Sequence, residues 1–231
     1  MRTPRLRDII SGGLAWLAVA GAIPTETKVD LELVLAVDIS GSVDAEEATL
    51  QRRGYVEALT SQSVIDAIRS GPHGRIAVTY VEWADRDQQR VVVGWRLVSD
   101  QASARAVAHE ISEASTQRWL STAIGAAIDF SVPLFDDNGF EGRRHVIDIS
   151  GDGHSNEGRP VTLARNAAIA AGITINGLSI PYDRGDPGGL AQYYAINVIG
   201  GPGAFQIVAI DFGDFGRAIR SKLVLEMGLS H

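Results

Sequence analysis

Residues 31–42 read LELVLAVDISGS, an apolar run followed at once by one carboxylate and two hydroxyl groups. The apolar part has the length and the Val and Leu content of a buried strand. Asp38, Ser40 and Ser42 follow at alternate positions, just past the carboxyl end of that strand, where open α/β sheets bind their ligands. Their oxygen atoms suit hard cations such as Mg²⁺, Mn²⁺ or Ca²⁺. The stretch therefore predicts a strand with a cation site at its end.

Strand and helix patterns alternate over the rest of the chain. Further strands are expected at 75–83, 89–98, 143–150, 173–180 and 204–210, and helices at 44–69, 100–115, 121–135, 160–171, 187–198 and 215–227. This alternation is typical of a doubly wound, mainly parallel sheet with helices on both faces. The second and third strands are too close in sequence for a helical crossover, so they are expected to pair antiparallel. We therefore expect a single α/β domain over residues 29–228, with a six-stranded sheet and one antiparallel edge strand.

The composition excludes several classes of function. The chain has 231 residues and a net charge of −7, whereas a general nucleic-acid binder needs a basic surface. It contains no cysteine, so disulfides, a thiol nucleophile and thiolate metal sites are excluded.

The first residues of the chain indicate export. Residues 1–7 carry three arginines, residues 9–22 are mostly apolar or small, and Ala20-Gly21-Ala22 has the small-x-small pattern of a cleavage site. This predicts a signal peptide over residues 1–22, cleaved after Ala22, and a linker over residues 23–28. The expected location is periplasmic or secreted, with no stable membrane insertion after cleavage. A retained membrane anchor is the alternative.

Two later segments add oxygen ligands to the first. Residues 120–124 (LSTAI) open a helix after a loop, which places Thr122 near the strand ends. Residues 150–153 (SGDG) end a strand, and their glycines permit a tight turn that exposes the Asp152 carboxylate. Each segment alone is explained as a helix cap or a turn, but together they favour a metal site. Asp148 competes with Asp152, although it is expected inside the strand. The predicted ligands are Asp38, Ser40, Ser42, Thr122 and Asp152.

The three segments together resemble the von Willebrand factor type A family. Its metal-ion-dependent adhesion site combines Asp-x-Ser-x-Ser with a distal Thr and a distal Asp. The first part stands complete as DISGS, LSTAIGAAI is similar to the Thr segment, and VIDISGDGHSNEG is similar to the Asp segment, with Asn156 as its Asn. One departure is Gly151, where the family often has Thr or Ser. The likeness is greatest to a poorly characterised bacterial group of secreted proteins that read Ser-Gly-Asp-Gly.

The resemblance implies a function for these residues. In the family, the serines and the Thr contact the metal directly or through water, the aspartates hold coordinated waters, and an open position accepts a partner's carboxylate. It thus implies a non-enzymatic, divalent-cation-dependent domain, with Mg²⁺ (or Mn²⁺ or Ca²⁺), that binds a protein offering an acidic side chain. One alternative is a Mg²⁺-dependent phosphohydrolase with Asp38 as nucleophile, although such enzymes usually need a second Asp where Ser40 stands. Another is a structural domain whose site binds no metal.

Overall fold

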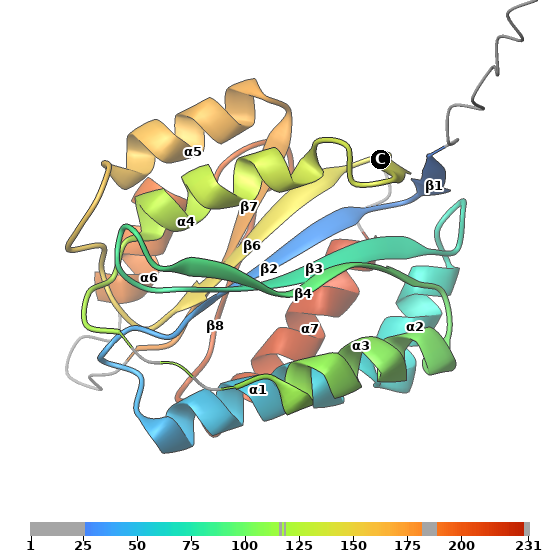
Figure 1. The fold of residues 1–231 in the computed structure, drawn as a ribbon, viewed down its shortest axis with the longest axis horizontal. Coiled ribbons are helices and arrows are strands. Elements are labelled where there is room, and N and C mark those ends of the chain that lie inside the picture. Colours follow the sequence, from blue (N-terminus) through green and yellow to red (C-terminus); the bar gives the residue numbers. More distant parts are fainter. Residues whose placement is uncertain (1–25, 116, 118, 182–188, 229–231) are drawn as a thin grey trace, which may run out of the picture.

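The computed structural model describes residues 26–115, 117, 119–181 and 189–228 (Figure 1). The expected signal peptide over 1–22, its cleavage point after Ala22 and residues 23–25 of the expected linker lie outside these residues.

The main sheet has six strands in the order β4-β3-β2-β6-β7-β8. They are β2 (Glu32–Asp38), β3 (Ile76–Trp83), β4 (Gln89–Val98), β6 (His145–Gly151), β7 (Ile173–Ser179) and β8 (Gln206–Val208). Neighbouring strands pair parallel except β3 and β4, which pair antiparallel at one edge. The predicted mainly parallel, six-stranded sheet with an antiparallel edge strand is therefore confirmed.

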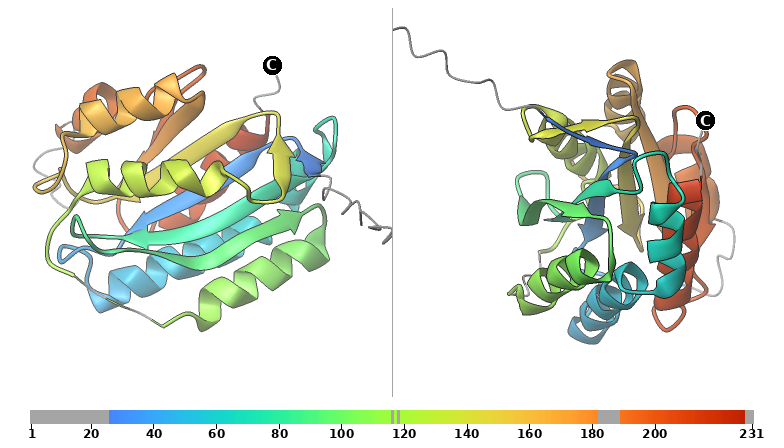
Figure 2. Two further views of the ribbon diagram at one scale, coloured as in Figure 1. Left: turned by 45° about the horizontal axis from the view of Figure 1, so that its top comes forward. Right: turned by 90° about the vertical axis from the view of Figure 1, so that its right-hand side faces the viewer.

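Helices cover both faces of this sheet, as expected for a doubly wound fold (Figures 1 and 2). One face carries α1 (Ala45–Leu59), α2 (Gln62–Arg69), α3 (Gln101–Glu113) and α7 (Phe215–Gly228). The other carries α4 (Ile124–Ser131), α5 (Val161–Ala170), α6 (Gly189–Tyr193) and the single turns η1 (Val132–Phe135) and η2 (Tyr194–Val198). Each face buries its own apolar cluster. No helix among the described residues has the length and apolar content to cross a membrane.

Three local features differ from the expectation. The helix expected at 44–69 is broken into α1 and α2, because the Thr60 and Ser61 hydroxyls donate to main-chain carbonyls at the end of α1 and so compete with the helical pattern. The helix expected at 121–135 begins only at Ile124. A small parallel sheet of β1 (Thr27–Val29) and β5 (Phe140–Gly142) was not expected, because three-residue strands are too short to give a periodic pattern.

The centre of the sheet sets the position of the candidate site. β2 is buried along its whole length and lies between β3 and β6 in parallel register, so three strand ends meet beside Asp38. α1 starts directly after the motif. Asp44 caps it and, with Glu47, forms a capping box, which fixes the chain on the far side of Ser42.

Candidate metal centre

The first segment of the site folds back on itself at the end of β2. The Asp38 carboxyl is fully buried, and its Oδ1 accepts a hydrogen bond of 2.7 Å from the main-chain N–H of Ser40. The Ser40 and Ser42 hydroxyls lie 3.2 Å apart. Ser40 is buried and Ser42 is exposed, so the motif leads from the interior to solvent.

The two distant segments meet the first one through their side chains. The Thr122 hydroxyl donates to Ser40 Oγ over 3.1 Å, and the Ser42 hydroxyl donates to Asp152 Oδ1 over 2.6 Å. The structure therefore brings all five predicted residues together at one point. The expectation that the turn exposes Asp152 is wrong, since this residue is only 6% exposed. Access to the cluster is through Ser42.

Two further residues, Asn156 and Asp85, hold the Thr122 loop in place. Neither is among the site residues predicted from the sequence. Asn156 Oδ1 accepts from the Thr122 main-chain N–H over 2.9 Å, and Asn156 N–H donates back to the Thr122 carbonyl over 2.9 Å. Asp85, just after β3, accepts from the Ser121 N–H over 2.5 Å. These main-chain bonds explain why α4 starts late. Asn156 could have been found from the sequence, because it matches the Asn of the von Willebrand factor type A pattern. Asp85 has no such signal except that it follows a strand.

Replacing Asn156 is expected to weaken cation binding without unfolding the protein. Asn156→Ala removes the acceptor that orients the Thr122 main chain, and loss of such outer contacts typically costs 10–100-fold in metal affinity. We expect about a tenfold loss of Mg²⁺ affinity by calorimetric titration. Asn166→Ala, on the exposed surface of α5, is the matched control. Equal Mg²⁺ affinities in the two variants would contradict this role.

A buried acid anchors the same loop farther upstream. Glu82 is 1% exposed and forms ion pairs of 2.6 Å with both Arg52 and Arg90. The two guanidinium groups in turn donate to the main-chain carbonyls of Ala114 and Ser115. Glu82 therefore fixes the point at which the chain leaves α3 toward Thr122. This role could not be predicted from the sequence, because one acid in an apolar strand forms no motif.

The carboxylates of the site have no compensating charge among the described residues. Burial, together with the nearby Asp152 carboxyl, raises the pKa of Asp38 to about 7. Burial also raises the pKa of Asp152. Asp38 Oδ2 and Asp152 Oδ2 are buried and have no hydrogen-bond partner within the part of the chain that the structure describes. Two buried carboxyls held together disfavour ionisation unless a cation joins them. The orphaned oxygens and the all-oxygen donor set therefore fit a hard divalent cation.

Asp148, the competing candidate, lies outside this cluster. It is fully buried inside β6, and its Oδ1 lies 2.9 Å from Lys222 Nζ on α7. Lys222 also pairs with Glu226 over 2.8 Å, and Asn176 donates to the same Glu226 oxygen over 2.8 Å. The structure thus assigns Asp148 to a buried ionic cluster of the core. Among the described residues, no group of three or more His, Cys, Asp or Glu side chains is arranged to hold a metal, so any cation site depends on hydroxyls.

Comparisons with known proteins agree on the fold. The model of a family described as "Protein of unknown function (DUF1194)" matches residues 28–230. A comparison with curated proteins finds no match. Among solved structures, the chain is similar to proximal thread matrix protein 1 from the mussel byssus, which has a zinc-occupied metal-ion-dependent adhesion site (MIDAS) motif. The TM-score is 0.62 and the identity is 16%, over 88% of this chain and 47% of that one.

Two bacterial structures are also similar. A von Willebrand factor type A protein from Catenulispora acidiphila has a TM-score of 0.58 and 17% identity, over 87% of this chain and 43% of that chain. An aerotolerance-related membrane protein from Bacteroides fragilis has a TM-score of 0.53 and 20% identity, over 84% of this chain and 98% of that chain. The chain thus spans about half the length of the mussel protein and nearly all of the B. fragilis structure. The predicted von Willebrand factor type A fold is confirmed.

Proposed function

We propose that this chain, which belongs to the DUF1194 family and has a von Willebrand factor type A fold, is a divalent-cation-dependent protein-binding domain. The observation that carries the proposal is a pair of buried carboxylate oxygens, on Asp38 and Asp152, that have no hydrogen-bond partner among the described residues. They lie beside the hydroxyls of Ser40, Ser42 and Thr122, so that three distant segments of the chain meet at one point. A cation at this point supplies the positive charge that both carboxyls lack.

The residues of the cluster have separate roles in this proposal. The hydroxyls of Ser40, Ser42 and Thr122 hold the cation, and the carboxylates of Asp38 and Asp152 act mainly by orienting the waters bound to it. We favour Mg²⁺, with Mn²⁺ or Ca²⁺ as substitutes, because neutral oxygens and retained waters suit these ions. The zinc-occupied motif of the mussel protein supports a divalent metal in general.

The proposed partner is a protein with an exposed acidic side chain. The chain carries a net charge of −7, which repels an approaching carboxylate, so the bound cation must supply the attraction. Because neutral hydroxyls leave much of the ion's charge uncompensated, the cation can accept a further carboxylate as ligand. Binding should therefore depend on the metal and be lost in a chelator.

Two measurements test the proposal. Calorimetric titration with Mg²⁺ is expected to show one site, and a pull-down from periplasmic extract is expected to recover a partner with Mg²⁺ and not with chelator. Absence of any heat of binding with Mg²⁺, Mn²⁺ and Ca²⁺ would favour a structural domain instead. Turnover of a generic phosphate ester would favour the phosphohydrolase. The full burial of Asp38 and its hydrogen bond from Ser40 N–H argue against its use as a nucleophile.

We also propose that the chain acts outside the cytoplasm. The proposal rests on the basic start, the short apolar stretch and Ala20-Gly21-Ala22. N-terminal sequencing of protein recovered from its native cells is expected to start at Ile23. Recovery of an intact Met1 in the cytosolic fraction would contradict export.

A further inference from the structure

Tyr194 is held in a slot made by two glycines on neighbouring strands. It begins η2, a single turn of π-helix, a feature that is frequent at functional sites. Its side chain is fully buried against the sheet face that α4 and α5 cover. A Cβ at Gly177 on β7 would lie 2.9 Å from the Tyr194 ring, and a Cβ at Gly151 on β6 would lie 2.7 Å from its hydroxyl. Neither strand could therefore carry a side chain here while Tyr194 keeps its place.

The hydroxyl of Tyr194 ends beside the candidate metal centre. The same Cβ at Gly151 would lie 2.8 Å from Asp38 Oδ2, so the phenol oxygen and this carboxylate oxygen flank one small space. Both oxygens are buried and lack a hydrogen-bond partner among the described residues. Buried polar groups normally have partners, and an unpartnered one calls for an explanation.

We propose that Tyr194 is a positioning residue of the metal centre, whose hydroxyl donates to Asp38 Oδ2, directly or through one water, across the space that Gly151 leaves open. The proposal rests on the proposed cation-dependent function. It assigns the two Asp38 oxygens different tasks, because Oδ1 already accepts from Ser40 N–H. Oδ2 then receives its donor from Tyr194 when the bound cation keeps Asp38 ionised.

The chemistry of the phenol suits this role. Burial raises the pKa of Tyr194 well above its usual range, and the Asp38 carboxyl raises it further. The hydroxyl therefore stays protonated and able to donate. A hydrogen bond to an ionised acceptor is stronger than one between neutral groups, so the bond is strongest in the cation-bound state. A side chain at position 151 would fill the space between the Tyr194 hydroxyl and Asp38 Oδ2. Such a side chain and the Tyr194 hydroxyl therefore cannot both be accommodated there.

Removing the Tyr194 hydroxyl while keeping the ring tests this role. Tyr194→Phe is compared with wild type and with Tyr55→Phe by Mg²⁺ calorimetry and by thermal melts without metal. Tyr55 is the matched control because it is equally buried and its hydroxyl lies 3.0 Å from Ser150 Oγ, next to Gly151 but on the opposite face of the sheet. We expect Tyr194→Phe to weaken Mg²⁺ binding about tenfold with no loss of metal-free Tm. Tyr55→Phe should lower Tm with and without metal and leave Mg²⁺ affinity unchanged.

The outcomes separate this inference from the proposed function. Wild-type protein that binds none of Mg²⁺, Mn²⁺ and Ca²⁺ overturns both. Wild-type protein that binds Mg²⁺, with equal affinity in Tyr194→Phe, overturns the role of Tyr194 alone. A fall in metal-free Tm without a change in affinity makes Tyr194 a packing residue and also overturns it.

A second substitution tests the same inference from the glycine side of the shared space. Gly151→Ala places a methyl group in the shared space and is expected to weaken Mg²⁺ binding in the wild-type background. In the Tyr194→Phe background, Gly151→Ala should cause a smaller further loss of Mg²⁺ affinity, because the hydroxyl that it displaces is already absent. Equal losses in both backgrounds would mean that the two positions act independently, which contradicts the proposal.

Discussion

Asp38→Asn and Asp152→Asn are expected to abolish the Mg²⁺-dependent gain in stability while leaving the metal-free protein folded. The amide keeps the volume of the buried carboxyl and, at position 38, retains an oxygen to accept from Ser40 N–H. It removes the charge that the cation needs. A ligand present at 100 times its dissociation constant stabilises the native state by about 2.7 kcal/mol, and this whole shift should vanish.

The metal-free variants should be at least as stable as metal-free wild type. Burial and the neighbouring carboxyl disfavour ionisation of Asp38, and a neutral amide removes that cost. Thermal melts with and without Mg²⁺ measure both effects. Asp66→Asn is the matched control, because Asp66 is exposed on α2, at the other end of the sheet (Figure 1). An unchanged Mg²⁺ shift in the Asp38 and Asp152 variants would place the metal elsewhere and refute the assigned site.

Lys222→Met is expected to destabilise the fold more than any other single change considered. Lys222 is fully buried between Asp148 and Glu226, and these carboxyls raise its pKa against the opposing effect of burial. Methionine fills a similar volume but leaves two buried acids without a cation. Breaking a buried ion pair from one side costs about 3–5 kcal/mol, measurable by urea unfolding.

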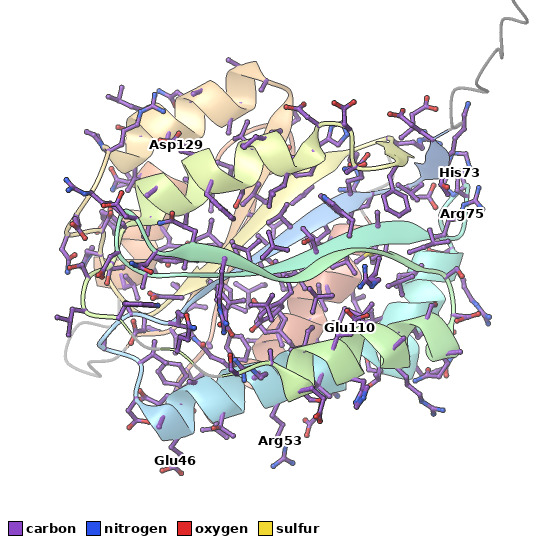
Figure 3. All side chains as sticks on the ribbon, in the orientation of Figure 1. Glu46, Arg53, His73, Arg75, Glu110 and Asp129 are labelled. Atoms are coloured by element: carbon purple, nitrogen blue, oxygen red, sulfur yellow. The ribbon has the colours of Figure 1, made fainter. Side chains whose placement is uncertain are left out.

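An exposed ion pair gives the control for this substitution. Arg53 projects from α1 into solvent (Figure 3) and pairs with Glu57, so Arg53→Met should change the free energy of unfolding far less than Lys222→Met does. Adding Glu226→Gln to Lys222→Met should recover part of the free energy of unfolding that Lys222→Met loses, because one uncompensated buried charge is then removed. Similar losses for Lys222→Met and Arg53→Met would contradict a core role for the cluster.

The same cluster predicts the pH dependence of that variant. Burial raises the pKa of Asp148 to about 6, even with the opposing effect of Lys222 included. The folded state therefore holds this proton more tightly than the unfolded chain, and stability is lost as pH rises from about 4 to about 6. Without Lys222 the folded pKa rises further, so Lys222→Met should keep losing stability above pH 6. A flat urea midpoint between pH 5 and 8 in this variant would contradict the assignment.

The sequence predicted those parts of the fold and site that follow from local pattern. β4 was predicted with its observed bounds, and its antiparallel pairing followed from the short link after β3. The residues that meet at the candidate site were found because each stands at a strand end or helix start. Glu82, Lys222 and Tyr194 were not found, because their roles come from what the fold places beside them. The sequence around a charged residue in an apolar segment does not show which residue it pairs with in the folded protein.

The contacts between the three segments also have a kinetic consequence. Thr122 reaches Ser40 across 82 residues of sequence, and Asp152 reaches Ser42 across 110. No short fragment of the unfolded chain contains all of these oxygens, so bringing them together requires contacts between distant segments of the chain. A ligand that needs so many distant contacts binds the finished native state and little that precedes it. The cation should therefore slow the unfolding rate and leave the refolding rate almost unchanged, so that in its presence the protein persists longer rather than forms faster.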